Sequence, residues 1–284
     1  MKERPKIVVT GANGQLGKEL KDLADVYPGY EFFFLSRSDL SIHHFELVRT
    51  YFNTLHPAYC INCAAYTAVD RAEQEKDLAY QVNAEAAGVL AAVCKEKNCK
   101  LIHISTDYVF NGEATVPYKE ESPTDPQCVY GASKLEGEKQ AIQFNPDVII
   151  IRTSWVYSTY GKNFVKTMMK LMQERNELSV VDDQTGSPTY AADLAEVILQ
   201  IISNWQPGIY HFSNDGVITW FDFANEIKKI TDSKTKINPV STAEYPTPAK
   251  RPAYSVLNKS KLQHTFHVEL KDWKQSLARC ISKM

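Results

Sequence analysis

The sequence lacks the features of several large classes of protein. Its 284 residues contain no apolar run near the ~18 residues of a membrane-spanning helix. The formal net charge of -2 provides no electrostatic footprint for nucleic acid, and the 44% hydrophobic content argues against disorder. No internal repeat is present, which excludes solenoids. We therefore expect a globular cytoplasmic protein that acts on a small molecule, without nucleic-acid or membrane partners.

Clustered metal ligands are also missing. The six cysteines include one C-x-x-C pair, Cys60 and Cys63, a spacing that occurs in redox and zinc sites. The pair lies in AYCINCAAY, which has the composition of a buried strand and its exit, and no second pair or histidine cluster supplies further ligands. We expect buried structural thiols and no metal site.

Short apolar runs alternate with amphipathic stretches over the first 155 residues. The runs are nearly continuous, which is typical of strands covered on both faces, and they span 6–10, 31–35, 59–65, 100–106 and 148–154. Apolar residues at helical spacing fill the stretches between them, at 14–25, 41–55, 79–98 and 130–143. This alternation predicts an α/β fold with a Rossmann-type doubly wound parallel sheet.

A glycine-rich loop directly follows the first expected strand. It reads Thr10-Gly-Ala-Asn-Gly14-Gln-Leu-Gly17, with glycines that allow a tight turn and a close approach to a pyrophosphate at the start of a helix. The spacing differs from the standard G-x-G-x-x-G, and a plain tight turn is the alternative. Its position favours a dinucleotide site, whose candidate residues here are Gly11, Asn13, Gly14, Gln15 and Leu16.

The end of the second expected strand selects the dinucleotide. An acidic side chain there would bind a ribose 2'-hydroxyl, whereas a basic one would accept a 2'-phosphate. Ser36 and Arg37 occupy this place, which favours NADPH. The alternative is a solvated Arg37, with Asp39 contacting the ribose of NADH.

After residue 155 the alternation loosens. We expect residues 1–154 to form the NADP-binding domain and residues 155–284 to form mainly a smaller C-terminal lobe that binds substrate. A helix and a strand within about 189–212 are expected to return to the first domain, so the chain crosses the boundary more than once.

A tyrosine and a lysine four residues apart, Tyr130 and Lys134 in YGASK, would share one face of a helix. A nearby ammonium favours the phenolate, and we expect it to lower the phenol pKa towards a value suited to proton transfer. Ser105 and Thr106 end the fourth strand, where ligands of open parallel sheets bind. Thr106 could hold a carbonyl oxygen while Tyr130 transfers a proton to it.

In this order along the chain, these residues resemble the extended short-chain dehydrogenase/reductases that act on nucleotide sugars. Further strings are most similar to the dTDP-4-dehydrorhamnose reductase family, namely VNAEAA, ISTDYVFNG, YGASKLEGE, RTSWVY, VVDDQTGSPTY and RPAYSVL. The resemblance implies NADPH-dependent reduction, with NADH at lower preference. The reaction would convert the 4-keto group of dTDP-4-dehydro-6-deoxy-L-mannose, giving dTDP-L-rhamnose as the last step of its biosynthesis.

The resemblance also assigns the remaining site residues. Asn83 would support Lys134 through water, and Trp155 would flank both the nicotinamide and the sugar. The added cofactor positions are Leu40, Cys63, Ala64, Ala65, Tyr66, Asn83, Ser105 and Trp155, beside Tyr130 and Lys134. The substrate positions are Thr67, Val69, Thr106, Tyr108, Trp155, Asn163, Phe164, Gln184 and Arg251. The Arg251 guanidinium could clasp a diphosphate, with a surface arginine as the alternative.

The chain lacks the acid-base pairs of related enzymes. Sugar-nucleotide dehydratases carry Asp-Glu after the threonine, but here Asp107 and Tyr108 follow Thr106. The alternatives are an epimerase-reductase of the GDP-fucose synthase type and a regulatory subunit like methionine adenosyltransferase β; no histidine can be assigned as a partner of Cys128 for the former. Glu19 matches one ligand of a metal-bridged dimer but the other ligands are missing, so we expect a monomer or weak homodimer without a bridging metal.

Overall fold

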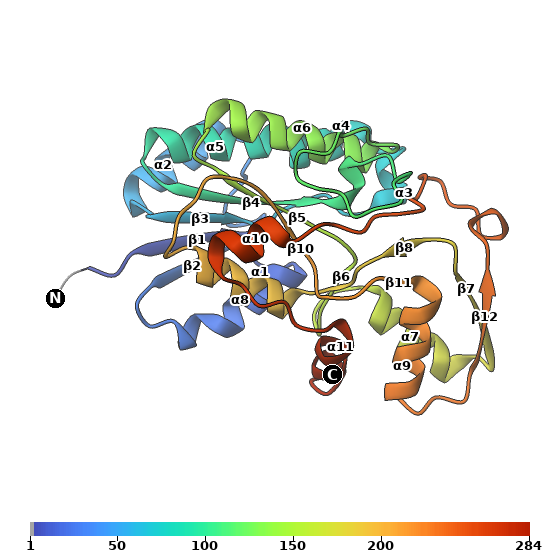
Figure 1. Cartoon of the computed structure of the whole chain (residues 1–284). Helices are drawn as coiled ribbons and strands as arrows, with labels where there is room; N and C mark the ends of the chain where they lie inside the picture. Colours follow the sequence, from blue (N-terminus) through green and yellow to red (C-terminus); the bar gives the residue numbers. More distant parts are fainter. Residues whose placement is uncertain (1–2) are drawn as a thin grey trace.

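A six-stranded parallel sheet forms the centre of the computed structural model, which describes residues 3–284 (Figure 1). Its strands are β1 (Lys6–Thr10), β2 (Glu31–Leu35), β3 (Tyr59–Asn62), β4 (Lys100–Thr106), β5 (Ile149–Thr153) and β10 (Gly208–Phe212), in the order β10-β5-β4-β3-β1-β2. β2 and β3 lie on opposite sides of β1. This topological switch opens a crevice at the carboxyl edge of the sheet, where ligands bind in such folds. The expected doubly wound sheet is confirmed.

Helices cover both faces of the sheet (Figure 1). On one face lie α2 (Phe45–Leu55), α5 (Ala86–Glu96) and α6 (Val129–Phe144), and on the other lie α1 (Gln15–Leu23) and α8 (Ala191–Ile201). The run Ile149–Ile151 shows why continuous apolar strands are needed. Ile149 and Ile151 pack into the core on the α8 side and Ile150 into the core on the α5 side, all without exposed surface.

The helical segment before β4 is interrupted. The sequence predicts one helix over 79–98, whereas the chain forms α4 (Lys76–Tyr80), a π-helical segment (Gln81–Glu85) and then α5. Close packing against α6 accompanies this segment, because a Cβ on Gly137 would lie 2.0 Å from the Asn83 carbonyl oxygen. Single π turns inside helices occur frequently at functional sites.

A second group of elements, here called the small lobe, lies beside the carboxyl edge of the sheet (Figure 1). It consists of α7 (Phe164–Glu174), β7 (Glu177–Val181), β8 (Thr185–Gly186), β11 (Ile218–Thr219), α9 (Trp220–Ile230) and β12 (Lys236–Val240). Its own core contains Val165, Met172, Phe223 and Ile227. β10 lies beside β5 in the main sheet, so the chain leaves the small lobe for the sheet and returns.

Helix α1 is hydrogen-bonded to the segment that leads into α7. The Asn163 amide donates to Gln15 Oε1 at 2.9 Å, and the Ser158 hydroxyl donates to Glu19 Oε1 at 2.5 Å. Burial raises the pKa of the Glu19 carboxyl. Among residues 3–284, no group of three or more His, Cys, Asp or Glu side chains could hold a metal ion.

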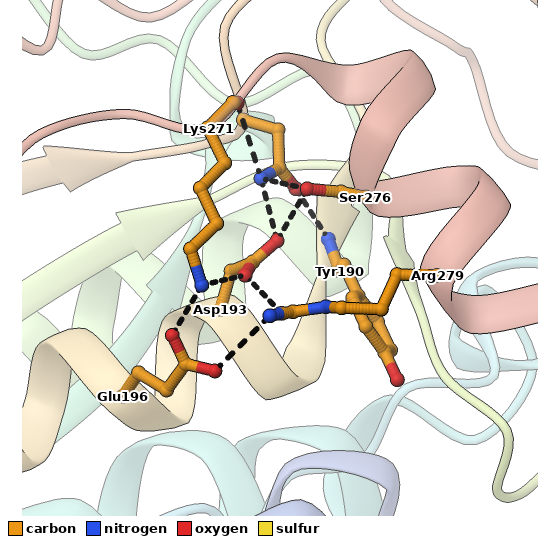
Figure 2. Close-up of polar contacts among 7 residues, drawn as sticks. Tyr190, Asp193, Glu196, Lys271, Ser276 and Arg279 are labelled. Carbon is orange, nitrogen blue, oxygen red and sulfur yellow. Dashed lines mark hydrogen bonds and ion pairs between the residues drawn. The ribbon is translucent and has the colours of Figure 1, made fainter. Parts of the chain in front are cut away.

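The C-terminal helix α11 (Trp273–Ile281) is fixed to α8 by a buried polar network (Figure 2). Asp193 on α8 accepts hydrogen bonds from Ser276 at 2.6 Å and Asn214 at 2.8 Å, and it pairs with Arg279 and Lys271. Two cations and two neutral donors thus compensate one buried carboxylate. In the described part of the chain, no helix has the length and apolar character needed to cross a membrane.

Candidate active site

Two adjoining cavities lie along the carboxyl edge of the sheet. The first has a volume of about 400 Å³ and the second of about 590 Å³. Gly14, Cys63 and Ala65 line both of them, which makes the two cavities neighbours over the switch point between β1 and β3. A ligand that extends from one cavity into the other would pass directly over the glycine loop.

The glycine loop is built for a close approach of the backbone. Gly11 has φ +69°, and a Cβ there would lie 2.6 Å from the Ala64 nitrogen. A Cβ on Gly17 would lie 2.5 Å from the Gly11 carbonyl oxygen. Among the described residues no side chain caps α1, whose N-cap is Gly14, so its first N–H groups can bind an anion. The loop fits a pyrophosphate.

The end of β2 borders the first cavity. Ser36, Arg37 and Leu40 line it, whereas Asp39 lies outside both cavities. The Asp39 carboxylate accepts from the Ser36 backbone N–H at 2.8 Å and from its hydroxyl at 2.6 Å, which holds the Asp39 pKa below its usual range. The Asp39 carboxylate is thus engaged in a local turn, and Arg37 is the charged residue of this turn that lines the cavity.

Cys63 shows where the expectation of buried thiols was wrong. Cys60, Cys94, Cys99, Cys128 and Cys280 are buried and all six cysteines are free, but Cys63 is only half-buried and lines both cavities. Its position at the exit of β3 places it on the wall of the first cavity, beside Ala64 and Ala65.

Tyr130 and Lys134 project from the first turns of α6 into the second cavity. Lys134 is 2% exposed, and its Nζ donates to the Ile104 carbonyl at 2.6 Å. Burial lowers the pKa of Lys134 to about 8, against the opposing effect of Glu138. The ammonium is thus held at the end of β4, within the same wall as the phenol.

The Tyr130 phenol differs from the sequence expectation. Burial raises its pKa, and only contact with Thr106 opposes that rise. The expected lowering by Lys134 is wrong for the protein alone, because the ammonium is drawn to the Ile104 carbonyl while the surrounding side chains desolvate the phenol. A phenol that keeps its proton at neutral pH is suited to be a donor rather than a base.

Thr106 ends β4 with its hydroxyl shared between two neighbours. It donates to Asp107 Oδ1 at 3.0 Å and accepts from the Tyr108 backbone N–H at 3.3 Å. Asp107 is 2% exposed, and burial raises its pKa to about 6. Its Oδ2 has no hydrogen-bond partner within residues 3–284. Asp107 was not among the site residues predicted from the sequence.

The glycine of YGASK has a packing role. A Cβ on Gly131 would lie 2.2 Å from the Tyr108 carbonyl oxygen, so only a glycine at this position lets the segment that contains Tyr108 pass so close to the start of α6. The Tyr108 ring contacts Tyr130 edge to face, with centroids 5.5 Å apart. Cys128 caps the helix, its Sγ accepting from the Gly131 N–H at 3.5 Å. The close packing of the Tyr108 segment on α6 thereby keeps the two aromatic rings in contact.

The second cavity collects most of the other predicted residues. Those on its wall are Gly14, Gln15, Leu16, Cys63, Ala65, Thr67, Val69, Ser105, Thr106, Tyr108, Tyr130, Lys134 and Trp155. The Ser105 hydroxyl, however, donates to Glu138 Oε1 at 2.5 Å and is occupied inside the protein. The first cavity is lined by Gly11, Asn13, Ala64 and Tyr66 among others.

Five further predicted residues do not line either cavity. Asn83 is buried and links the Tyr66 backbone to Ser133, so the structure assigns its amide to protein groups. Asn163 caps α7, Phe164 packs on Trp220, Gln184 donates to Thr242 at 3.0 Å, and Arg251 pairs with Asp70 at 2.7 Å.

Asp107 is one of several cavity-wall residues that the sequence did not predict, and four others illustrate why. Ser41 and His43 line the first cavity, and Lys162 and Trp220 line the second. Ser41 and His43 stand four and six residues beyond Arg37, a local signal that was available. Lys162 and Trp220 come from loops and helices distant in sequence, and no local pattern marks them.

Comparison with known proteins agrees with this geometry. The family model described as RmlD substrate binding domain matches residues 5–284. A dTDP-4-dehydrorhamnose reductase from Aggregatibacter actinomycetemcomitans is 41% identical, covering 96% of this chain and 97% of that protein.

Two solved structures are similar over the whole chain. A dTDP-4-dehydrorhamnose reductase from Clostridium acetobutylicum has a TM-score of 0.95 at 43% identity, covering 98% of this chain and 99% of the other. One from Bacillus anthracis in complex with NADP has a TM-score of 0.96 at 40% identity, covering 99% and 100%. This chain belongs to the RmlD substrate binding domain family.

Proposed function

We propose that this protein is an NADPH-dependent reductase of a nucleotide sugar, which converts the 4-keto group of dTDP-4-dehydro-6-deoxy-L-mannose to the alcohol of dTDP-L-rhamnose. The observation that carries this proposal is the second cavity, where Thr106, Tyr130 and Lys134 lie on one wall beside the glycine loop. The similar protein from Bacillus anthracis, described in complex with NADP, and the named reductases support the cofactor and the substrate.

Each of the two cavities would bind a different part of the ligands. Gly11 and Gly14, with the start of α1, would hold the pyrophosphate, and Arg37 would face the 2'-phosphate at the end of β2. NADPH, when bound, supplies a hydride to the carbonyl carbon. The half of the site beyond Gly14, lined by Thr67, Tyr108 and the catalytic groups, would take the sugar.

The proton then comes from Tyr130. As the carbonyl carbon gains the hydride, its oxygen becomes an alkoxide, which is a much stronger base than a phenolate, so transfer from the Tyr130 hydroxyl is downhill even with a raised pKa. Lys134 stabilises the resulting phenolate, which regains a proton from solvent. The Thr106 hydroxyl, a donor to Asp107 here, turns to the substrate oxygen and orients it.

We further propose that the small lobe binds the nucleoside diphosphate. Arg251, in the segment that follows β12, supports this assignment, because its side chain is only 20% exposed and is held by Asp70, the residue after Val69 of the second cavity. A diphosphate would compete with Asp70 for the same fork of donors. The division into a cofactor domain over residues 1–154 and a mainly substrate-binding lobe over 155–284 remains part of this proposal.

Reduction is favoured over the epimerase-reductase alternative by the state of Cys128. An epimerase would need an acid-base pair beside the ketone. Burial raises the pKa of the Cys128 thiol, and its sulfur accepts a hydrogen bond from the start of α6. A buried thiol in a capping role is a poor proton acceptor.

The variant Tyr130→Phe tests the proton donor. It keeps the ring and removes the hydroxyl, so we expect kcat to fall about 10²–10⁴-fold, the usual contribution of general acid catalysis, with the Kd for NADPH nearly unchanged. Turnover is measured by NADPH absorbance and binding by fluorescence titration. Tyr245→Phe, at an exposed tyrosine, is the matched control and should keep full activity. Equal losses of turnover and binding would instead make Tyr130 a structural residue.

A further inference from the structure

Two tryptophans stack where the small lobe meets the second cavity. Trp155 follows β5 and Trp220 opens α9, and both line the cavity. Their ring centroids are 3.6 Å apart with an interplanar angle of 10°. This indole pair, Trp155 with Trp220, joins the segment that leaves β5 to a helix of the small lobe. Neither ring is fully buried, so both present surface to a ligand.

Trp155 has a backbone conformation that bulky residues rarely adopt. Its φ is +47°, in the left-handed region. The ring lies over Gly186, where a Cβ would come within 2.6 Å of the indole Cε2 and 2.7 Å of Cζ2. The glycine therefore makes room for the ring on one side. On another side the ring is supported by Trp220 through the stack.

Trp220 is itself held firmly. The preceding residue, Thr219, forms a capping box with Asp222, with hydrogen bonds of 3.1 and 3.0 Å. Strand β11 pairs with β8, setting Ile218 opposite Gly186. Phe164 at the start of α7 packs against the Trp220 ring at 4.6 Å. The β8–β11 pair thus carries Gly186, which leaves space for the Trp155 ring, and leads directly into Trp220, which stacks on that ring.

We propose that Trp220 is a positioning residue of the reductase, which holds Trp155 in its left-handed conformation against the reacting sugar and nicotinamide. This inference rests on the proposed function, because Trp155 lines the cavity in which the sugar and the nicotinamide would meet. Trp220 acts through Trp155, because the flat stack leaves the indole of Trp155 one orientation between Trp220 and Gly186. Loss of the Trp220 ring should disturb the alignment of the reacting atoms more than the affinity for NADPH, because the loop that would hold the pyrophosphate is built from other residues.

The test compares Trp220→Ala and Trp220→Phe in the full chain. An alanine removes the stacking surface, and we expect kcat to fall about 10- to 10²-fold, in the range that small misalignments of reacting groups produce. The Kd for NADPH should change less than about threefold, a minor change beside that misalignment effect. Phenylalanine keeps a flat ring and should restore most of kcat. Trp205→Phe, at a tryptophan packed against Tyr59, is the matched control.

A second variant approaches Trp155 from its other side. Gly186→Ala would push the indole through the Cβ contact while leaving the Trp220 side chain intact, and it should give the same loss of kcat with NADPH binding retained. It also keeps the inference testable if Trp220→Ala does not fold. Turnover of Trp220→Ala within twofold of the wild type, or equal losses of turnover and NADPH binding, would overturn the positioning role. A wild-type chain that does not reduce the sugar would overturn the proposed function itself.

Discussion

The buried ion pair beneath the active site offers a stability test with a defined magnitude. Glu138 lies two turns beyond Tyr130 on the same face of α6, and it accepts hydrogen bonds from Arg152 on β5 at 2.7 and 2.9 Å and from Ser105 on β4 at 2.5 Å. Glu138 and Arg152 are each 2% exposed. The pair therefore ties the catalytic helix to two strands of the sheet.

The substitution Glu138→Gln keeps the volume but leaves the Arg152 charge without its counterion. Removing one member of a buried pair costs about 3–5 kcal/mol. We therefore expect the free energy of unfolding to fall by about 3 kcal/mol or more. At roughly 2–4 °C per kcal/mol for large domains, the melting temperature should fall by roughly 6–12 °C.

Urea unfolding at pH 7, followed by circular dichroism, measures this loss. Glu136→Gln makes the same change on a neighbouring position of α6, where the carboxylate accepts a hydrogen bond from the Gln140 amide at 3.2 Å, and should stay close to the wild type. The double variant Glu138→Leu with Arg152→Met should regain much of the loss, because apolar replacements of both partners are often neutral. A Glu138→Gln protein within about 1 kcal/mol of the wild type, the worth of an exposed pair, would refute the reasoning.

Two further predictions concern the cofactor and the pH dependence. Arg37→Asp should move the preference towards NADH by about 10-fold or more, because a charge-assisted hydrogen bond of about 1.5–3 kcal/mol to the 2'-phosphate is lost; an unchanged ratio of kcat/KM for the two cofactors would contradict this. Lys134 has its pKa lowered to about 8, so its ammonium is lost as the pH rises through that value, and kcat/KM should fall above pH 8. The unfolded chain binds this proton more tightly, so the same group makes the free energy of unfolding rise between about pH 8 and its unfolded pKa of about 10.4. The fall of kcat/KM above pH 8 should persist in Lys162→Met. If it disappears in that variant, the titrating group is Lys162 and the assignment to Lys134 is wrong.

The parts of the fold that depend on local pattern could be predicted from sequence. β1, β2 and β4 have the predicted bounds, because consecutive apolar residues fill the middle of each run, as is typical of strands covered on both faces. The glycine loop and the Tyr130–Lys134 pair were also accessible, since both depend on spacing within one turn. Local spacing does not indicate which partner each side chain contacts once the helices have packed on the sheet.

Several contacts that the sequence did not predict join segments far apart in the chain. Arg251 pairs with Asp70, 181 positions away, and Trp220 reaches Trp155 from another part of the chain. The direction of the Ser105 hydroxyl depends on Glu138 and Arg152, which meet only when α6 packs on the sheet. The raised pKa of Tyr130 likewise comes from burial by distant segments. No periodicity in the sequence encodes these contacts.

We propose that a 4-keto sugar is reduced by NADPH in the second cavity. The most direct measurement is NADPH oxidation with dTDP-4-keto-6-deoxyglucose, with and without the epimerase that converts it to the L-lyxo isomer. We expect turnover only when the epimerase is present, and loss of that turnover in Tyr130→Phe. Turnover without the epimerase would contradict a dedicated reductase of the L-lyxo sugar, and tight NADPH binding without any turnover would contradict catalysis at this site.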